Sequence, residues 1–256
     1  MSLGDRLAEL APRHGAPRIL THDIECAPAL VYAWGLFDQN IGIAQVVEPP
    51  RMLSFAAKWY GDKAIHYWSE FHHSREEMAR QSWRMFDDAD VVVGYNHVRF
   101  DVPWLNSEWL RAGLGPPSPW VDIDLLSVNR RRFRNLSNKL TYVVEQAGLP
   151  AKLETGGQSL WNKCLQGDPK AWATFKRYNI KDVLITEQLF DYLRPWIKGP
   201  HLGQWSGMKD CCYACGGVDL DLVGLVYGKT TAYPKLICSS CGAVNKVLRN
   251  GETRVV

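Results

Sequence analysis

The distribution of cysteines restricts the fold of this 256-residue chain more than any other feature. Cys26 and Cys164 stand alone, whereas the others crowd into the last fifth of the sequence: Cys211, Cys212, Cys215, Cys238 and Cys241. The N-terminus lacks the hydrophobic run of a secretory signal, so we expect a cytoplasmic, reducing environment in which thiols are metal ligands or buried rather than disulfide-bonded. Residues 199–203 (GPHLG) break a long helical pattern. The sequence therefore predicts two domains, residues 1–200 and residues 201–256.

Four of the crowded cysteines form two C-x2-C pairs, Cys212/Cys215 and Cys238/Cys241, and a glycine follows each pair. Such a glycine lets the chain turn so that backbone N–H groups face the thiolates. Two matched pairs favour a tetrahedral zinc site over redox dithiols. The segment resembles a zinc ribbon, with one structural Zn²⁺ that would supply much of its folding energy. Cys211 could compete through C-x3-C spacing, but we favour Cys212.

The role of this zinc ribbon has two interpretations. Its basic residues contact nucleic acid, or they are solvated side chains on a purely structural module. The formal net charge of +3 neither requires nor excludes a nucleic-acid partner. The basic residues concerned are Lys229, Lys235, Lys246 and Arg249.

The first 200 residues alternate between strand-like and helix-like patterns. The run of valines at 91–93 is typical of a strand covered on both faces of a sheet. Ser74 and Glu77 form a capping box at the start of a helix, and Asp168 with Pro169 starts the last one. This order predicts an α/β fold with a mixed β-sheet flanked by helices. We expect strands at 18–25, 30–37, 51–60, 64–69 and 90–94, and helices at 74–89, 99–112, 138–147 and 169–196.

Acidic residues occur at three places that could carry chemistry. Asp23 and Glu25 lie two residues apart, so both side chains point to one face of a strand, where burial of two like charges would require a cation. Asp101 begins a helix after the valine-rich strand. Tyr178 and Asp182, four residues apart, project from one face of the last helix. Each place taken alone also fits an ordinary solvated turn or helix surface.

Taken in order, these places resemble a known enzyme superfamily. The motifs are DIE at 23–25, NHVRFD at 96–101 and YNIKD at 178–182. They are similar to the three motifs of the DEDD (DnaQ-like) 3′–5′ exonucleases, which share a ribonuclease-H-like fold, and Tyr178 matches the Tyr-bearing subclass (DEDDy). One departure is Cys26, where many relatives carry threonine.

The resemblance implies a role for each acid. Two Mg²⁺ or Mn²⁺ ions would stabilise the charge on the attacking and leaving oxygens of a phosphodiester, and carboxylate oxygens suit these ions. Asp23 would bridge both metals, Glu25 and Asp182 would complete the first site, and Asp101 would hold the second. Tyr178 would orient or help activate the attacking water.

Substrate contacts are expected from two segments. Asn96 and Phe100 lie in the second motif and could place the terminal nucleotide. The densest basic run surrounds an aromatic ring at Phe133, a combination that suits phosphate contacts and base stacking on a single strand, although it also fits a solvated loop. The basic residues of this run are Arg130, Arg131, Arg132 and Arg134.

The sequence therefore predicts a metal-dependent 3′–5′ exonuclease that releases nucleoside 5′-monophosphates from single-stranded or frayed DNA 3′ ends. A polymerase domain does not fit in 256 residues, so a proofreading role would need a polymerase or other replication partner. No membrane-spanning run is present. The chain also resembles phage-encoded or bacterial enzymes of DNA metabolism, which would place a phage product in the host cytoplasm. The alternatives are a 3′–5′ exoribonuclease and an inactive nucleic-acid-binding module.

Overall fold

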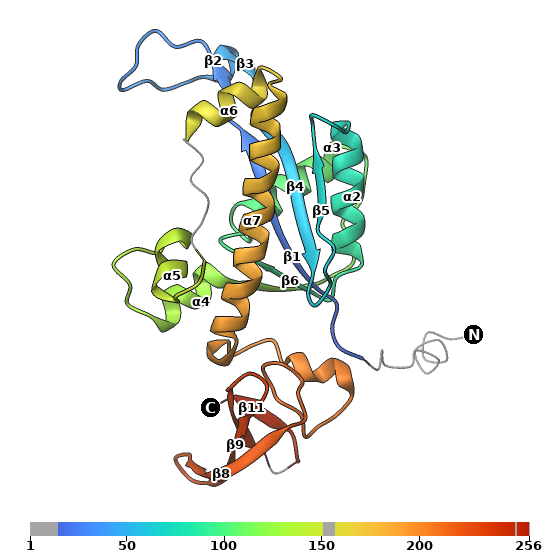
Figure 1. Cartoon of the computed structure of the whole chain (residues 1–256), viewed down its shortest axis with the longest axis vertical. Coiled ribbons are helices and arrows are strands. Elements are labelled where there is room, and N and C mark those ends of the chain that lie inside the picture. The colour runs from blue at the N-terminus through green and yellow to red at the C-terminus, as the bar shows by residue number, and fades with distance from the viewer. Residues whose placement is uncertain (1–14, 151–156, 249, 256) are drawn as a thin grey trace, which may run out of the picture. The chain divides into compact units, whose positions relative to one another are not determined.

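The computed structural model describes residues 15–150, 157–248 and 250–255 (Figure 1). The chain forms two compact units. One unit comprises residues 19–124 and 139–187, and the other comprises residues 15–18, 125–138 and 188–255. The longest helix, α7 (Pro169–Leu193), contributes residues to both units. A domain boundary near residue 200 stays a prediction.

The first unit is built on a mixed five-stranded sheet in the order β5-β4-β1-β6-β7. The central strand β1 runs antiparallel to β4 and parallel to β6. The predicted mixed sheet is thus confirmed, with one strand that the sequence patterns missed, β7. The strands are β1 (Ile19–Ala27), β4 (Arg51–Trp59), β5 (His66–Ser69), β6 (Val91–Gly94) and β7 (Val121–Asp124).

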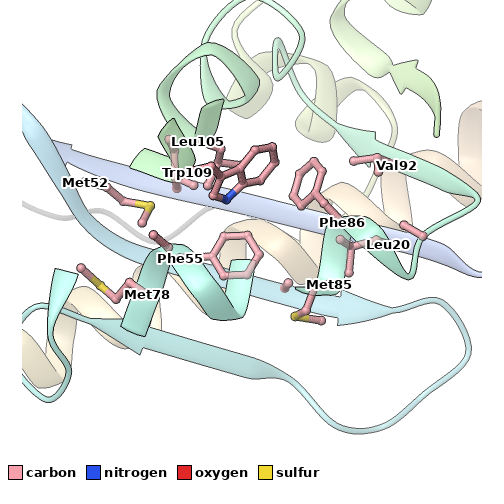
Figure 2. Close-up of a cluster of buried hydrophobic side chains, with 13 residues drawn as sticks. Leu20, Met52, Phe55, Met78, Met85, Phe86, Val92, Leu105 and Trp109 are labelled. Carbon is pink, nitrogen blue, oxygen red and sulfur yellow. The ribbon is translucent and has the colours of Figure 1, made fainter. Parts of the chain in front are cut away.

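Helices pack on the two faces of this sheet. On one face, α2 (Arg75–Asp87) and α3 (Asp101–Arg111) enclose a core in which Phe55, Phe86 and Trp109 lie side by side (Figure 2). The Phe86 and Trp109 rings meet edge to face at 5.2 Å between centroids. On the other face, α6 (Gln158–Leu165) and α7 pack with Leu53 and Ala27. Both faces of the central strands are therefore buried, as the valine-rich run indicates.

Local signals place α2 and α7 where the sequence predicts them. The Ser74 hydroxyl accepts the Glu77 backbone N–H at 3.1 Å, and the Asp168 carboxylate accepts the Lys170 N–H at 2.8 Å. The α-helix α7 ends at Leu193 rather than at residue 196, and a 3-10 turn covers Arg194–Trp196. Pro195 has no N–H to continue the helical hydrogen bonds. Two short helices, α4 (Leu125–Arg132) and α5 (Leu140–Gln146), lie between β7 and α6 in the sequence.

The predicted strand at 30–37 is wrong in length. Strand β2 covers only Leu30–Val31, which pairs with β3 (Val46–Glu48), and a 3-10 turn at Ile43–Gln45 precedes β3. The hydrophobic residues beyond β2 face solvent, with Trp34 97% exposed. A run of apolar residues forms a strand only where a partner strand and a core lie beside it, and residues 32–37 have neither among the described residues.

The C-terminal segment forms a separate antiparallel sheet in the order β11-β10-β9-β8. A 3-10 turn at Leu202–Ser206 precedes it. No helix in the described part of the chain is both long and apolar enough to cross a membrane. The strands are β8 (Leu220–Tyr227), β9 (Ala232–Cys238), β10 (Val244–Val247) and β11 (Thr253–Val255).

Candidate active site

Three carboxylates converge between β1 and α7. Asp23, Glu25 and Asp182 each offer an oxygen, and these oxygens all lie within 4.8 Å of one another. Asp23 and Glu25 share one face of β1, as their spacing predicts. Asp182 comes from α7 and is only 2% exposed. Residues 157 positions apart in the sequence therefore form one acidic cluster.

A β-bulge shifts the register between β1 and β4 beside this cluster. Glu25 pairs with Ser54 and Cys26 pairs with Met52, so Leu53 on β4 is the extra residue. A bulge bends the strand and re-aims the side chains next to it. The bulge thus lies directly after Glu25, the second acidic residue of β1.

Tyr178 lies on α7, as Asp182 does, and packs against an indole ring from α6 that the motifs did not include. The ring of Trp161 on α6 meets the ring of Tyr178 edge to face at 6.0 Å between centroids. The Trp161 indole N–H also donates to the Cys26 carbonyl at 3.2 Å. Trp161 therefore connects Tyr178 to the end of the strand that carries Asp23 and Glu25. Tryptophan spacing alone gave no signal for this contact.

Asp101 lies next to the acidic cluster but is not one of its three carboxylates, Asp23, Glu25 and Asp182. It begins α3, and its Oδ1 accepts the backbone N–H of Ile24, the residue between the two β1 acids, at 3.1 Å. Burial raises the pKa of Asp101 to about 7. A buried carboxylate beside other carboxylates is stabilised as an anion when a cation lies nearby.

The second motif turns sharply at Asn96, which adopts a left-handed backbone conformation with φ of 66°. The Asn96 N–H donates to Oδ1 of Asp124 at the end of β7, at 3.1 Å. Asp124, another residue that the sequence analysis missed, thereby holds this turn. Phe100 is 45% exposed. Asn96 and Phe100 thus both lie just before Asp101, the first residue of α3.

His97, the second residue of the second motif, lies inside the fold. It is 1% exposed, and its Nδ1 lies 3.2 Å from Nε2 of the buried His22. A Cβ atom at Gly94 would lie 2.6 Å from the His97 Cβ, so the close packing of this histidine requires glycine at 94. Burial lowers the pKa of both histidines below 6.5.

The donor set of the cluster fits a hard divalent cation. Mg²⁺ and Mn²⁺ prefer carboxylate oxygens, and three such groups that project together from β1 and α7 provide them. Three like charges so close together repel one another unless a cation compensates them. Asp23, Glu25 and Asp182, with Asp101 beside them, could therefore hold divalent metal ions.

Comparison with known proteins places this site in a family. The family model for the RNase_H superfamily matches residues 51–194, which are more than half of the chain. The chain belongs to the RNase_H superfamily. This superfamily comprises hydrolytic nucleases that use divalent metals. Asp101, Tyr178 and Asp182 lie within the matched residues of this RNase_H superfamily chain, whereas Asp23 and Glu25 precede them.

Two DNA polymerases are similar to parts of this RNase_H superfamily chain. It is 38% identical to the DNA polymerase delta catalytic subunit of Dictyostelium discoideum in an alignment over 100 residues that covers 35% of this chain and 9% of that protein. The structure of the family B DNA polymerase from Pyrobaculum calidifontis superposes with a TM-score of 0.52 at 21% identity, over 86% of this chain and 32% of that one. The chain thus spans a small part of each polymerase, and the structural likeness supports the fold alone.

A second cluster, outside the RNase_H superfamily match, joins four thiols. The sulfur atoms of Cys212, Cys215, Cys238 and Cys241 lie within 4.8 Å of one another. The Sγ–Sγ distance is 3.7 Å for Cys212 and Cys241 and 3.6 Å for Cys215 and Cys238. Four Zn–S bonds of ~2.3 Å in a tetrahedron would separate the sulfurs by ~3.8 Å, whereas a disulfide is ~2.05 Å long. The spacing of the four sulfur atoms is therefore compatible with a zinc module and not with disulfide bonds.

The structure decides between the two adjacent cysteines. Cys212 joins the cluster, while the Cys211 thiol lies 3.3 Å from the Met208 carbonyl oxygen. Gly216 and Gly242, which follow the two pairs, have φ of 77° and 73°. The Gly217 N–H donates to Cys215 Sγ at 3.3 Å. This N–H orients the Cys215 sulfur and stabilises it as a thiolate.

The basic run lies on a helix rather than in a loop. Arg130, Arg131 and Arg132 form the last turn of α4, Arg134 follows, and all four side chains are exposed. The ring of Phe133 packs edge-on against Trp196 at 5.3 Å between centroids. This run belongs to the unit that does not contain the acidic cluster. Of the basic ribbon residues, Arg249 lies outside the described residues.

Proposed function

We propose that this chain is a metal-dependent 3′–5′ exonuclease of the Tyr-bearing DEDD class, which releases nucleoside 5′-monophosphates from DNA 3′ ends. The observation that carries the proposal is the convergence of Asp23, Glu25 and Asp182 from β1 and α7. Membership of a nuclease superfamily supports it. The relative that is 38% identical over 100 residues is a DNA polymerase catalytic subunit, which favours DNA as the substrate and a polymerase as a partner.

In this proposal each protein group has a definite task. Asp23, Glu25 and Asp182, together with Asp101, would hold two Mg²⁺ or Mn²⁺ ions, and these would supply charge stabilisation for the attacking and leaving oxygens. Tyr178 positions the attacking water and accepts a hydrogen bond from it or donates one to the scissile phosphate, while Trp161 holds the phenol ring in place. Asn96 and Phe100 place the terminal nucleotide.

The remaining residues bind and support the substrate. Arg130, Arg131, Arg132 and Arg134 contact the phosphates of a single strand or a frayed end, since their exposed guanidinium groups remain accessible. Residues 1–200 form the exonuclease domain, and residues 201–256 form a zinc ribbon with one structural Zn²⁺ on its four clustered cysteines.

A labelled-end assay tests the proposal. DNA and RNA oligonucleotides, labelled at the 3′ or the 5′ end, are incubated with the protein in Mg²⁺, in Mn²⁺ and in excess EDTA. We expect immediate loss of the 3′ label from DNA, stepwise shortening of the 5′-labelled strand, and no cleavage in EDTA. Asp182→Asn should abolish cleavage, whereas the control Glu76→Gln changes an exposed acid of α2 and should retain it.

Each other outcome has a defined meaning. Faster shortening of RNA than of DNA would identify an exoribonuclease. Binding of both oligonucleotides with no cleavage in either metal would identify a binding module. Full activity of folded Asp182→Asn would contradict the assignment of the acidic cluster.

A further inference from the structure

A buried amide lies directly behind the acidic cluster. Asn179, between the two motif residues of α7, is fully buried. Its Nδ2 donates to Oδ2 of Asp23 at 2.6 Å, and its Oδ1 accepts the hydroxyl of Ser54 at 2.9 Å. Ser54 is also fully buried and is the β4 partner of Glu25. Three elements, β1, β4 and α7, thus meet through one hydrogen-bonded chain.

The chemistry of these groups fixes the direction of the chain. An ionised carboxylate only accepts hydrogen bonds, so the amide nitrogen of Asn179 must face Asp23. The amide oxygen then faces Ser54, whose hydroxyl supplies the donor. A flipped amide would set its oxygen against the Asp23 carboxylate and leave Ser54 without its acceptor. Ser54 therefore locks the amide in the orientation that serves Asp23.

A neutral donor suits a residue beside a metal site. A lysine or arginine at this position would neutralise Asp23 and compete with a bound cation for its charge. The amide instead fixes the rotation of the carboxylate and leaves its negative charge in place. Burial strengthens the hydrogen bond because water does not compete for it.

We propose that Asn179 is a positioning residue, which together with Ser54 presets the Asp23 carboxylate for divalent-cation binding. This inference rests on the proposed function, because it assumes that Asp23 is a metal ligand. It assigns to the residue between Tyr178 and Asp182 a task that neither of those residues performs. The resulting expectation concerns metal affinity, which can be measured without substrate.

The test measures Mn²⁺ binding to the zinc-loaded full chain by the loss of the free Mn²⁺ signal in electron paramagnetic resonance. We expect Asn179→Ala to weaken Mn²⁺ binding at least tenfold, since loss of a group that orients a ligand weakens metal affinity by about 10–100-fold. Ser54→Ala keeps the amide and should weaken binding about threefold, and Ser54→Thr should restore it because the hydroxyl returns. Cleavage by Asn179→Ala should recover in part at high Mg²⁺.

The matched control removes a buried hydroxyl elsewhere in the same unit. Ser82 is fully buried, and its Oγ accepts the Trp109 indole N–H at 2.9 Å. Ser82→Ala should therefore lower the melting temperature without changing Mn²⁺ affinity. If Asn179→Ala does not fold, Ser54→Ala carries the test.

Wild-type Mn²⁺ affinity in folded Asn179→Ala, or in Ser54→Ala where Asn179→Ala does not fold, would overturn the inference, even if the wild-type protein cleaves DNA. A wild-type protein that binds Mn²⁺ but cleaves nothing would overturn the proposed function, while a metal-affinity loss in Asn179→Ala would still support the positioning role. A wild-type chain that binds no Mn²⁺ would overturn both.

Discussion

Replacing Asp182 by asparagine should stabilise the metal-free protein while removing its response to Mg²⁺. The oxygens of Asp182, Asp23 and Glu25 lie within 4.8 Å of one another. At an effective dielectric constant of ~20, two unit charges at that distance repel by ~3.5 kcal/mol. Asparagine has nearly the same shape and no charge, so it relieves two such repulsions at once.

The net gain is smaller than this sum because Asp23 and Glu25 are only partly buried and solvent screens them. We expect about 2 kcal/mol of added stability, which raises the melting temperature by about 4–8 °C for a domain of this size. In saturating Mg²⁺ the order should reverse, because bound metal stabilises only the wild-type protein.

The assay is thermal unfolding of the zinc-loaded chain in buffer freed of other divalent metals, with and without added Mg²⁺. A Mg²⁺ concentration of about 10 mM lies far above the dissociation constant of even a weak Mg²⁺ site. Glu76→Gln is the control, since it removes an exposed charge paired with Arg80 at 2.7 Å and should change stability by less than about 0.5 kcal/mol. Equal or lower stability of metal-free Asp182→Asn, or a Mg²⁺-induced rise equal to that of wild type, would refute the electrostatic reasoning.

Four further predictions follow from other contacts. Tyr178→Phe should slow cleavage about 10–100-fold, less than Asp182→Asn, because Trp161 still holds the ring; equal losses in single-turnover assays would contradict this. Cys238→Ser should reduce bound zinc, measured by mass spectrometry at one ion per wild-type chain, and unfold the C-terminal sheet, seen as lost amide-exchange protection; retained zinc and protection would argue against the site. Alanine at Arg130, Arg131, Arg132 and Arg134 should weaken oligonucleotide binding and flatten its salt dependence, and an unchanged slope would exclude phosphate contacts. Burial lowers the pKa of His97, so this residue makes the unfolded chain bind more protons below pH 6.5 and stability fall on acidification. His97→Gln should therefore lose less stability than wild type between pH 7.5 and 5.5, while the raised pKa of Asp101 acts in the opposite direction in both proteins; equal losses in urea unfolding would contradict the assignment.

Residues with strong local signals were predictable from the sequence. The α2 helix starts at its serine cap because the Ser74 hydroxyl and the Glu77 N–H lie within one turn. The side chains of Asp23 and Glu25 share a face because the pleat repeats every two residues. The prediction failed after β2, since Trp34 lies in an apolar run typical of a strand but has no core to cover it.

Contacts between distant segments were beyond any local pattern. Asn179 lies in a recognised motif, yet only the structure shows its bonds to Asp23 and Ser54, from 156 and 125 residues away. The burial of His97 against His22 is of the same kind. Each depends on how β1, β4, β6 and α7 pack, and packing is decided by the whole core rather than by neighbours in the sequence.

The sequence by itself determined which residue types were available for chemistry, their faces on single strands and helices, and the paired spacing of the cysteines. Only the tertiary structure decided that Asp182 meets Asp23 and Glu25, that Cys212 rather than Cys211 joins the thiol cluster, and that a neutral amide orients Asp23. The physical reason is one of range. Backbone geometry fixes side-chain directions over a few residues, whereas a site made of like charges exists only where long-range packing forces those charges together.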